Sequence, residues 1–317
     1  MLRDYKEEDK KIIHSITFDN LEEVLKYIEE TPVNTSFWGN DVEALLSRNP
    51  KRYDVCQTKN VDEAIELCRY GNFEAKKDII KIGQALNFNV PCSLNTRKTT
   101  LTSHGYRPDI PRNIMGHPNQ MYRIVRDESK KFINIYYNVV EGSGSSVDAI
   151  YNKGILAIKL VDLLEKLGYR VNFNFFELSE EYCFGGKTEY FYFKMNIKNF
   201  NEKLDPDICY FPICHPSFLR RIIPAVKETI EFSNNEWTRR YGQVVKKDKQ
   251  VEIIGVNEED ILISSCRDLG IIGIDIYKDV QNFIKNINLS KYLDEGSNLE
   301  FNEKSKTFVL TTNNKRR

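Results

Sequence analysis

The sequence predicts an α/β fold in which helices flank a mostly parallel sheet, and three neighbouring features carry that prediction. Residues 132–138 form a strand of aromatic and β-branched residues that runs into a loop of glycine and serine. A long amphipathic helix follows, and residues 170–178 resume a strand directly after it. Because a helix joins the two strands, their connection is a right-handed parallel crossover. We therefore expect a Rossmann-like sheet between residues 131 and 290.

The connecting helix has start and stop signals at its two ends. Ser145 and Asp148 have the spacing of a capping box, and Gly168 stands where a C-cap glycine belongs. Eight apolar residues between these signals follow a helical stripe: Val147, Ile150, Tyr151, Ile155, Ile158, Val161, Leu164 and Leu167. After the second strand, a Gly185-Gly186 turn leads to a strand at 188–197, which we expect to be antiparallel and at the edge of the sheet.

The remaining elements divide the chain into three parts. In the core, 127–295, we also expect strands at 208–212, 251–255 and 261–265 and helices at 216–232, with a kink at Pro224, and at 279–293. The N-terminal region, 1–126, is predicted to be mainly helical, and a dense run of prolines and glycines predicts a long loop at 90–120. The predicted helices of this region cover 19–30, 41–47, 61–70 and 76–86, and a frayed tail is expected at 296–317.

Composition narrows the functional classes. The chain has 46 basic and 46 acidic residues, which argues against coating nucleic acid or membrane by net charge alone but allows a local basic patch. No long apolar run and no signal-like start are present, so we expect a cytoplasmic protein without membrane contact. The seven cysteines lack paired metal-ligand spacing, and we expect reduced, mostly buried thiols.

The loop after the first core strand is the main candidate for a ligand site. In an open parallel sheet, ligands bind beyond the carboxyl ends of the strands, beside a helix amino terminus. Gly142 and Gly144 would let the backbone approach a ligand, and Ser146 would offer a hydroxyl. Neither a Walker A loop nor a G-x-G-x-x-G fingerprint is present. The simpler explanation is that the loop only caps the following helix.

A divalent-metal site at the same edge is the second candidate. Hard cations such as Mg²⁺ or Mn²⁺ prefer carboxylate, amide and hydroxyl oxygens. The expected ligands come from the first loop and from the acid that follows the strand at 261–265: Asn138, Glu141, Ser143, Ser145 and Asp268. Asp268 has an alternative role as a turn or cap residue.

These residues carry a resemblance to the von Willebrand factor A-like fold. The order of strand, serine loop, long helix, strand, edge strand, helix and strand with a terminal acid is similar to that family. The family places a metal-dependent adhesion motif, D-x-S-x-S, after its first strand. Here Glu141-Gly-Ser143-Gly-Ser145 gives E-x-S-x-S, with glutamate in place of aspartate. The resemblance implies a metal held by Ser143, Ser145 and Asp268, and a protein partner.

A second resemblance covers more of the chain. A start containing Trp38, the segment at 112–121 and the strand with its serine loop look like a group of uncharacterised tailed-bacteriophage proteins. This resemblance implies a phage origin and expression in the cytoplasm of a bacterial host.

We expect a binding or scaffolding protein whose core docks a partner protein, with residues 90–120 contributing to the surface. No complete constellation for acid-base, nucleophilic or hydride chemistry is present, so the sequence does not decide whether the protein is an enzyme. One alternative is an enzyme or sensor that holds a phosphate-bearing molecule at residues 142–146. Another is single-strand nucleic-acid binding by a basic and aromatic surface around Trp237 that includes Arg220-Arg221, Arg239-Arg240 and Lys246-Lys247.

Overall fold

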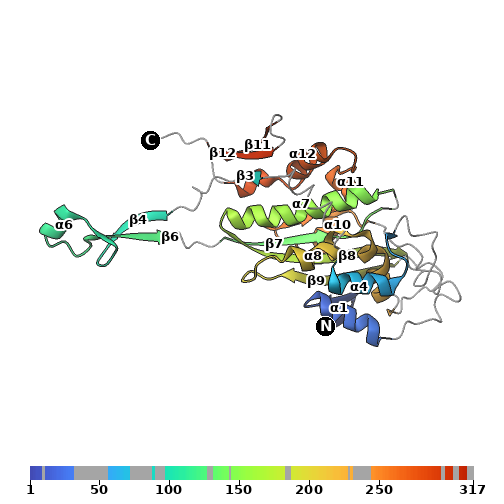
Figure 1. Cartoon of the computed structure of the whole chain (residues 1–317). Coiled ribbons are helices and arrows are strands. Elements are labelled where there is room, and N and C mark those ends of the chain that lie inside the picture. Colours follow the sequence, from blue (N-terminus) through green and yellow to red (C-terminus); the bar gives the residue numbers. More distant parts are fainter. Residues whose placement is uncertain are drawn as a thin grey trace.

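The architecture comes from a computed structural model of the whole chain (Figure 1). It describes residues 1–8, 11–31, 56–71, 88–89, 97–126, 131–142, 144–182, 187–227, 229–230, 244–293, 297–302 and 307–312. The predicted helices at 41–47 and 76–86 lie outside these residues.

A six-stranded sheet forms the centre of the molecule, with strand order β1-β2-β9-β8-β7-β10. Its strands are β1 (Leu2–Glu8), β2 (Lys11–Phe18), β7 (Lys131–Asn138), β8 (Tyr169–Tyr182), β9 (Thr188–Lys198) and β10 (Ile261–Ile263). The α/β class is confirmed, but the sheet is mixed. The described pairings β2·β9, β8·β7 and β7·β10 are parallel, whereas β1·β2 and β9·β8 are antiparallel, so the prediction of a mostly parallel sheet is not supported.

The predicted strand-helix-strand unit is confirmed. Helix α7 (Val147–Lys166) joins β7 to β8, and these strands pair in parallel from Lys131 with Tyr169 to Asn138 with Phe176. The helix starts one residue later than the predicted capping box, because Ser146 caps it by accepting a hydrogen bond from the Ala149 amide at 3.1 Å. Gly168 follows the helix with φ +93°, the left-handed conformation that makes glycine suitable at this end.

The N-terminal residues add a hairpin to the sheet, which the predicted mainly helical region did not include. β2 buries Ile12, Ile16 and Phe18 and pairs in parallel with β9, so β9 is antiparallel to β8, as predicted, but is not at the edge. β1 takes the edge position, and its charged sequence LRDYKEE fits an exposed edge strand better than a core strand. Because this sequence does not alternate apolar and polar residues, hydrophobic periodicity does not predict β1 as a strand.

Several helices follow the strand β9. They are α8 (Pro206–Cys214), the π-helix η4 (Phe218–Ile222), α9 (Ile223–Lys227), α10 (Lys247–Ile254), α11 (Cys266–Leu269), α12 (Ile276–Asn286) and the 3-10 helix η5 (Leu289–Tyr292). Two predicted strands are therefore wrong, since 208–212 lies in α8 and 251–255 lies at the end of α10. Both are short apolar runs, which periodicity cannot assign to strand or helix. In its described part, the helix predicted at 216–232 contains the π-helix η4 followed by α9.

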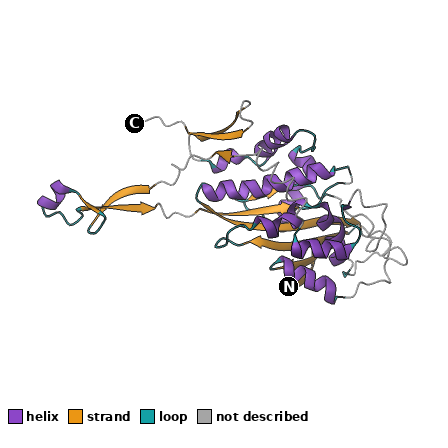
Figure 2. Ribbon diagram, viewed as in Figure 1, coloured by secondary structure: helices purple, strands orange, loops and turns teal. Residues whose placement is uncertain are grey.

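Side chains from the two faces of the sheet enter two cores. Alternate residues such as Ile135, Phe173, Phe175 and Phe193 pack with α7, α8, η4 and α9, together with α1 (Leu21–Glu30) and α4 (Val61–Tyr70), which were predicted as helices. The next residues along the strands, Phe176 and Leu178 among them, enter a smaller core with the end of α10. Helices thus cover both faces of the sheet around β7 and β8 (Figure 2).

The predicted long loop at 90–120 contains regular structure where it is described. β4 (Arg97–Thr102), β5 (Arg107–Pro108) and β6 (Met121–Arg126) form an antiparallel sheet of order β4-β6-β5, and the short helix α6 (Ile110–Ile114) follows β5. We call residues 97–126 the arm. The arm lies apart from the main sheet, with α6 at its far end (Figure 1).

The predicted frayed tail also contains strands. β11 (Ser297–Asn302) and β12 (Thr307–Thr312) form a hairpin, and β12 pairs in parallel with β3 (Phe88–Asn89). Among the described residues, no helix has the length and apolar character needed to cross a membrane.

Candidate functional site

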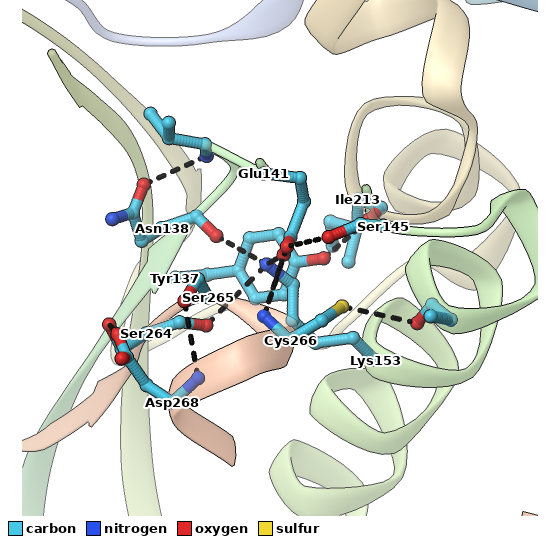
Figure 3. Close-up of polar contacts among 12 residues, drawn as sticks. Tyr137, Asn138, Glu141, Ser145, Lys153, Ile213, Ser264, Ser265, Cys266 and Asp268 are labelled. Carbon is cyan, nitrogen blue, oxygen red and sulfur yellow. Dashed lines mark hydrogen bonds and ion pairs between the residues drawn. The ribbon is translucent and has the colours of Figure 1, made fainter. Parts of the chain in front are cut away.

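The candidate site lies at the carboxyl edge of the sheet, where two loops meet. One loop leaves β7 at Asn138 and reaches α7 at Val147, and the other leaves β10 at Ile263 and enters α11 at Cys266. β7 and β10 are parallel neighbours, so both loops emerge at the same edge. Asn138, Glu141 and Ser145 are thereby brought into one polar network with Asp268, which is far from them in the sequence (Figure 3).

A buried ion pair stands at the centre of this network. The Glu141 carboxylate accepts a hydrogen bond from the Lys153 ammonium, and both side chains are fully buried. Lys153 projects from the second turn of α7 and also donates to the Asn138 carbonyl at 2.7 Å and to the Ser264 carbonyl at 3.5 Å. Its ammonium lies 4.7 Å from the centre of the Tyr137 ring. One cation therefore joins β7, α7 and the loop after β10.

The remaining acceptor positions of Glu141 are also used. The Cys266 amide donates to both carboxylate oxygens, at 3.1 and 3.0 Å, and the Ser145 hydroxyl donates to Oε2 at 3.1 Å. The Cys266 amide belongs to the first turn of α11, where a carboxylate is favoured by the helix dipole. Burying a carboxylate is costly unless it is paired and hydrogen-bonded, and both conditions are met here.

A second chain of hydrogen bonds runs beside the ion pair. The Asn138 side chain accepts from the Val140 amide at 2.9 Å and donates to Gln250 at 3.1 Å. Gln250, on α10, donates to the Ser264 hydroxyl at 3.2 Å, which in turn donates to the Asp268 carboxylate at 2.6 Å. Asn138 and Asp268 are therefore connected through Gln250 and Ser264 rather than through a shared ligand.

The other predicted ligand residues have different surroundings. Ser146 is exposed, but its hydroxyl accepts from the Ala149 amide and donates to the Ile272 carbonyl at 3.1 Å. Gly144 is exposed and Gly142 half-buried, and a Cβ on either glycine would meet no atom within 4 Å. Ser143 lies outside the described residues. Asp268 is exposed in the first turn of α11, and its amide donates to the Ser265 hydroxyl at 3.3 Å.

The negative charge of Glu141 at the sheet edge is neutralised by the Lys153 ammonium. Within the described part of the chain, no group of three or more His, Cys, Asp and Glu side chains has an arrangement that could hold a metal ion. The Lys153 ammonium already contacts Glu141 and two loop carbonyls, all oxygen groups of the kind a hard cation would bind. A divalent ion bound by Glu141 would have to displace this ammonium.

An exposed apolar rim adjoins the network. Ile272 and Ile274, which follow α11, are 53% and 88% exposed. The buried carboxylate of Asp279 fixes their loop, because it accepts from the Ile272 amide at 2.8 Å, the Gly273 amide at 2.9 Å and the Asn152 side chain on α7 at 3.0 Å. Gly273 approaches α7 so closely that a Cβ there would lie 2.5 Å from the Ala149 nitrogen. The rim is thus held rigidly against the start of α7.

A buried histidine, the described cysteines and the basic residues expected around Trp237 do not form a reactive site. Burial lowers the pKa of His215 to about 4, and its ring stacks on Phe211 with centroids 4.6 Å apart, so it is a neutral core residue near pH 7. Burial raises the pKa of Cys214 and Cys266, and every described cysteine is buried and free. Arg221 is buried and donates to the Thr58 and Lys59 carbonyls, which contradicts its place in a basic surface, while 231–243, including Trp237, lie outside the described residues.

Sequence reasoning missed Lys153, Gln250 and the Cys266 amide. A signal for Lys153 was present, because it stands three residues after Ile150 and four before Ala157 on the buried face of α7. A lysine on such a face needs a buried acceptor, and Glu141 is the acid nearest to it in the preceding loop. Gln250 carried no comparable signal, because it stands directly before residues 251–255, which were predicted to form a strand.

The comparison with known proteins gives one match. No curated protein and no solved structure matches the chain. A family model described as a domain of unknown function, DUF7192, matches residues 7–291, which include strands β2, β7, β8, β9 and β10 of the main sheet, the arm and the polar network. The chain therefore belongs to the DUF7192 family.

Proposed function

We propose that the protein is a binding or scaffolding protein that docks a partner protein at the carboxyl edge of β7 and β10. The observation that carries this proposal is the rim of Ile272 and Ile274, which exposes two large apolar side chains on a loop fixed by Asp279. Exposed apolar groups on a rigid support, surrounded by polar residues, are typical of protein interaction sites.

The chemistry of the network also favours binding over catalysis. Every described polar group at its centre is used by a neighbour: Glu141 by Lys153, Ser145 and Cys266, and Asp268 by Ser264. A general base or nucleophile needs an accessible group next to the substrate, and Glu141 and Lys153 have no exposed surface. These groups make a rigid platform for the rim.

The strand order supports the resemblance to the von Willebrand factor A-like fold. The run β7, α7, β8, antiparallel β9, helices and β10 follows the order on which that resemblance rests, except that β9 is not at the edge of the sheet. Ser145 lies on the loop after β7, and Asp268 lies in the first turn of α11, which follows β10. In this proposal the Lys153 ammonium, rather than a divalent ion, neutralises Glu141. A phage origin in a bacterial host stays a prediction from the second resemblance.

The competing phosphate-binding function finds less support at this site. The amino terminus of α7 has Asp148 in its first turn, and Asp268 lies in the first turn of the neighbouring helix α11. Ser146 already occupies the Ala149 amide, which an anion would otherwise contact. Nearby carboxylates weaken the attraction of a helix amino terminus for phosphate.

The test is affinity capture of partners by the purified protein from cells in which it is naturally made. The double variant Ile272→Glu, Ile274→Glu should lose a partner that the wild type retains, because it places two charges on the apolar rim. The matched control is Leu2→Glu, Tyr70→Glu, which changes two exposed apolar residues elsewhere on the main body. A partner that both variants retain, or that only the control loses, would contradict docking at the rim.

Calorimetric titration with Mg²⁺ and Mn²⁺ separates the two ways of neutralising Glu141. We expect no binding heat for the wild type and a measurable heat for Lys153→Ser, which leaves the carboxylate without its ammonium. Heat in the wild type that disappears in Ser145→Ala would instead support a metal-dependent site at this edge, with the partner supplying a further acid.

A further inference from the structure

The arm concentrates positive charge in a chain that is neutral overall. Residues 97–126 contain six Lys or Arg residues and one acidic residue, a net charge of +5, whereas the whole chain has 46 of each sign. The basic residues are Arg97, Lys98, Arg107, Arg112, Arg123 and Arg126. An excess of this size on a small ribbon produces a local field that attracts anionic partners.

The single acid of the arm is used internally. Asp109 caps α6 by accepting from the Arg112 amide at 3.2 Å, and it accepts from the Tyr122 hydroxyl at 2.6 Å. These hydrogen bonds lower the pKa of the Asp109 carboxyl, so it stays ionised and shapes the arm. It does not form an ion pair with an arginine in the described part of the chain.

The arginines are therefore available to an external anion. Arg107 and Arg123 are exposed, and no described carboxylate forms an ion pair with Arg107, Arg112 or Arg123. Arg107 lies 5.8 Å from the Tyr122 ring centre, and Arg123 lies 3.4 Å from the His104 ring nitrogen, so these contacts position the guanidinium groups without neutralising them. Exposed Thr99, Thr100, Ser103 and Asn113 add hydroxyl and amide donors.

The far end of the arm has an apolar tip beside these charges. Ile110, Ile114 and Met115, on and just after α6, are 66%, 82% and 75% exposed. They are carried by an antiparallel ribbon in which β6 pairs with both β4 and β5. Figure 1 shows α6 at the end of the ribbon, beyond β4 and β6. The arm thus combines a basic β-ribbon with an apolar tip formed by these three residues.

We propose that the arm binds duplex nucleic acid, with the arginines on the phosphates and the apolar tip against the base steps. Proteins that bind DNA through β-strands place them in the major or the minor groove, and architectural proteins that bind the minor groove insert residues such as Ile, Met and Pro between base steps. Protein interfaces exclude charge from their centres, whereas nucleic-acid interfaces are strongly positive, so the charge favours nucleic acid over an acidic protein. This site is separate from the rim of Ile272 and Ile274 and does not depend on it.

The experiment measures fluorescence anisotropy of a labelled 20-base-pair DNA duplex titrated with the full-length protein at several salt concentrations. The test variant is Arg107→Gln, Arg112→Gln, Arg123→Gln. Its control, Lys203→Gln, Lys278→Gln, Lys285→Gln, removes the same charge from exposed positions on the main body. We expect at least a tenfold loss of affinity in the arm variant, and a slope of log affinity against log salt that falls by about one for each lost phosphate contact. The control should change affinity less than threefold.

Three outcomes would overturn the proposal. Equal losses in the arm and control variants would mean that only net charge matters. Equal or tighter binding of a single strand of the same length would exclude a duplex site. Binding of a polyglutamate peptide or of vesicles containing anionic lipid, without binding of the duplex, would assign the arm to an acidic protein or to a membrane surface.

A fourth variant, Ile114→Ser with Met115→Ser, tests the apolar tip. Both side chains are more than 70% exposed, so the exchange should leave folding unchanged. We expect a severalfold loss of affinity with an unchanged salt slope, because the tip makes no phosphate contact. An unchanged affinity would show that the tip does not touch the bases.

Discussion

The polar network at the sheet edge and the basic arm differ in whether their charged groups are paired inside the protein. Glu141 and Lys153 are fully buried and form an ion pair with each other, and their contacts connect β7, α7 and α11. Arg107 and Arg123 are exposed and have no carboxylate partner among the described residues, so they add little to folding. The contrast shows that a charged cluster indicates binding only where its charges are not already neutralised inside the protein.

The largest expected effect comes from breaking the buried ion pair. Lys153→Met should lower the free energy of unfolding by about 3–5 kcal/mol, because it leaves the Glu141 carboxylate buried without a cation. Urea denaturation measures the change. The control is Lys166→Met on the same helix, which removes an exposed pair with Asp162 and should cost less than about 1 kcal/mol. Similar losses in both variants would contradict a central role for the pair.

The core histidine should make stability depend on pH. Folding lowers the pKa of His215 from 6.5 to about 4 because the ring is buried. Between these values the unfolded chain binds more protons, so stability is complete above the unfolded pKa and is lost as the pH falls towards 4. From pH 7 to pH 5 we expect a loss of about 2 kcal/mol from this group.

The comparison of wild type with His215→Gln isolates that contribution. The variant should lose less stability than the wild type over the same pH range, as measured by urea denaturation at each pH. Parallel pH curves for the two proteins would show that the ring becomes protonated without cost.

A substitution in the arm should act locally. A Cβ at Gly105 would lie 2.2 Å from the Tyr122 carbonyl oxygen, so Gly105→Ala must separate β6 from the turn before β5. We expect hydrogen exchange of the Tyr106 amide, which bonds to that carbonyl at 2.9 Å, to rise at least tenfold. Amides of β7 and β8 should exchange as in the wild type. A matching rise in those strands would mean that the arm and the main sheet unfold together.

The smallest effect on stability is expected from the arm arginines. Arg107→Gln, Arg112→Gln, Arg123→Gln should change the free energy of unfolding by less than about 1 kcal/mol, because the variant breaks no described ion pair. Thermal unfolding followed by circular dichroism measures this. A loss as large as that of Lys153→Met would place these charges in the fold instead of at a binding surface.

Local patterns in the sequence were sufficient for the centre of the fold. The apolar strands around β7 and β8 and the long stripe of α7 predicted the parallel crossover, because each element has many residues with one clear period. The helices α1, α4 and α12 were recognised for the same reason. The antiparallel direction of β9 followed from the short turn before it.

Only the tertiary structure decided how these elements combine. The charged strand β1 joins the sheet through β2, which pairs with β9, and residues 247–254 form a helix that places Gln250 between Asn138 and Ser264. The roles of Glu141 and Asp268 also depended on their partners in the fold. The Glu141 carboxylate accepts hydrogen bonds from Lys153 and from the Cys266 amide, and the Asp268 carboxylate accepts one from the Ser264 hydroxyl. The sequence by itself determined which residues at the sheet edge are polar. Only the tertiary structure determined that Lys153 contacts Glu141 there. The physical reason is that a buried charge needs a partner, and no local pattern contains the contacts that supply one.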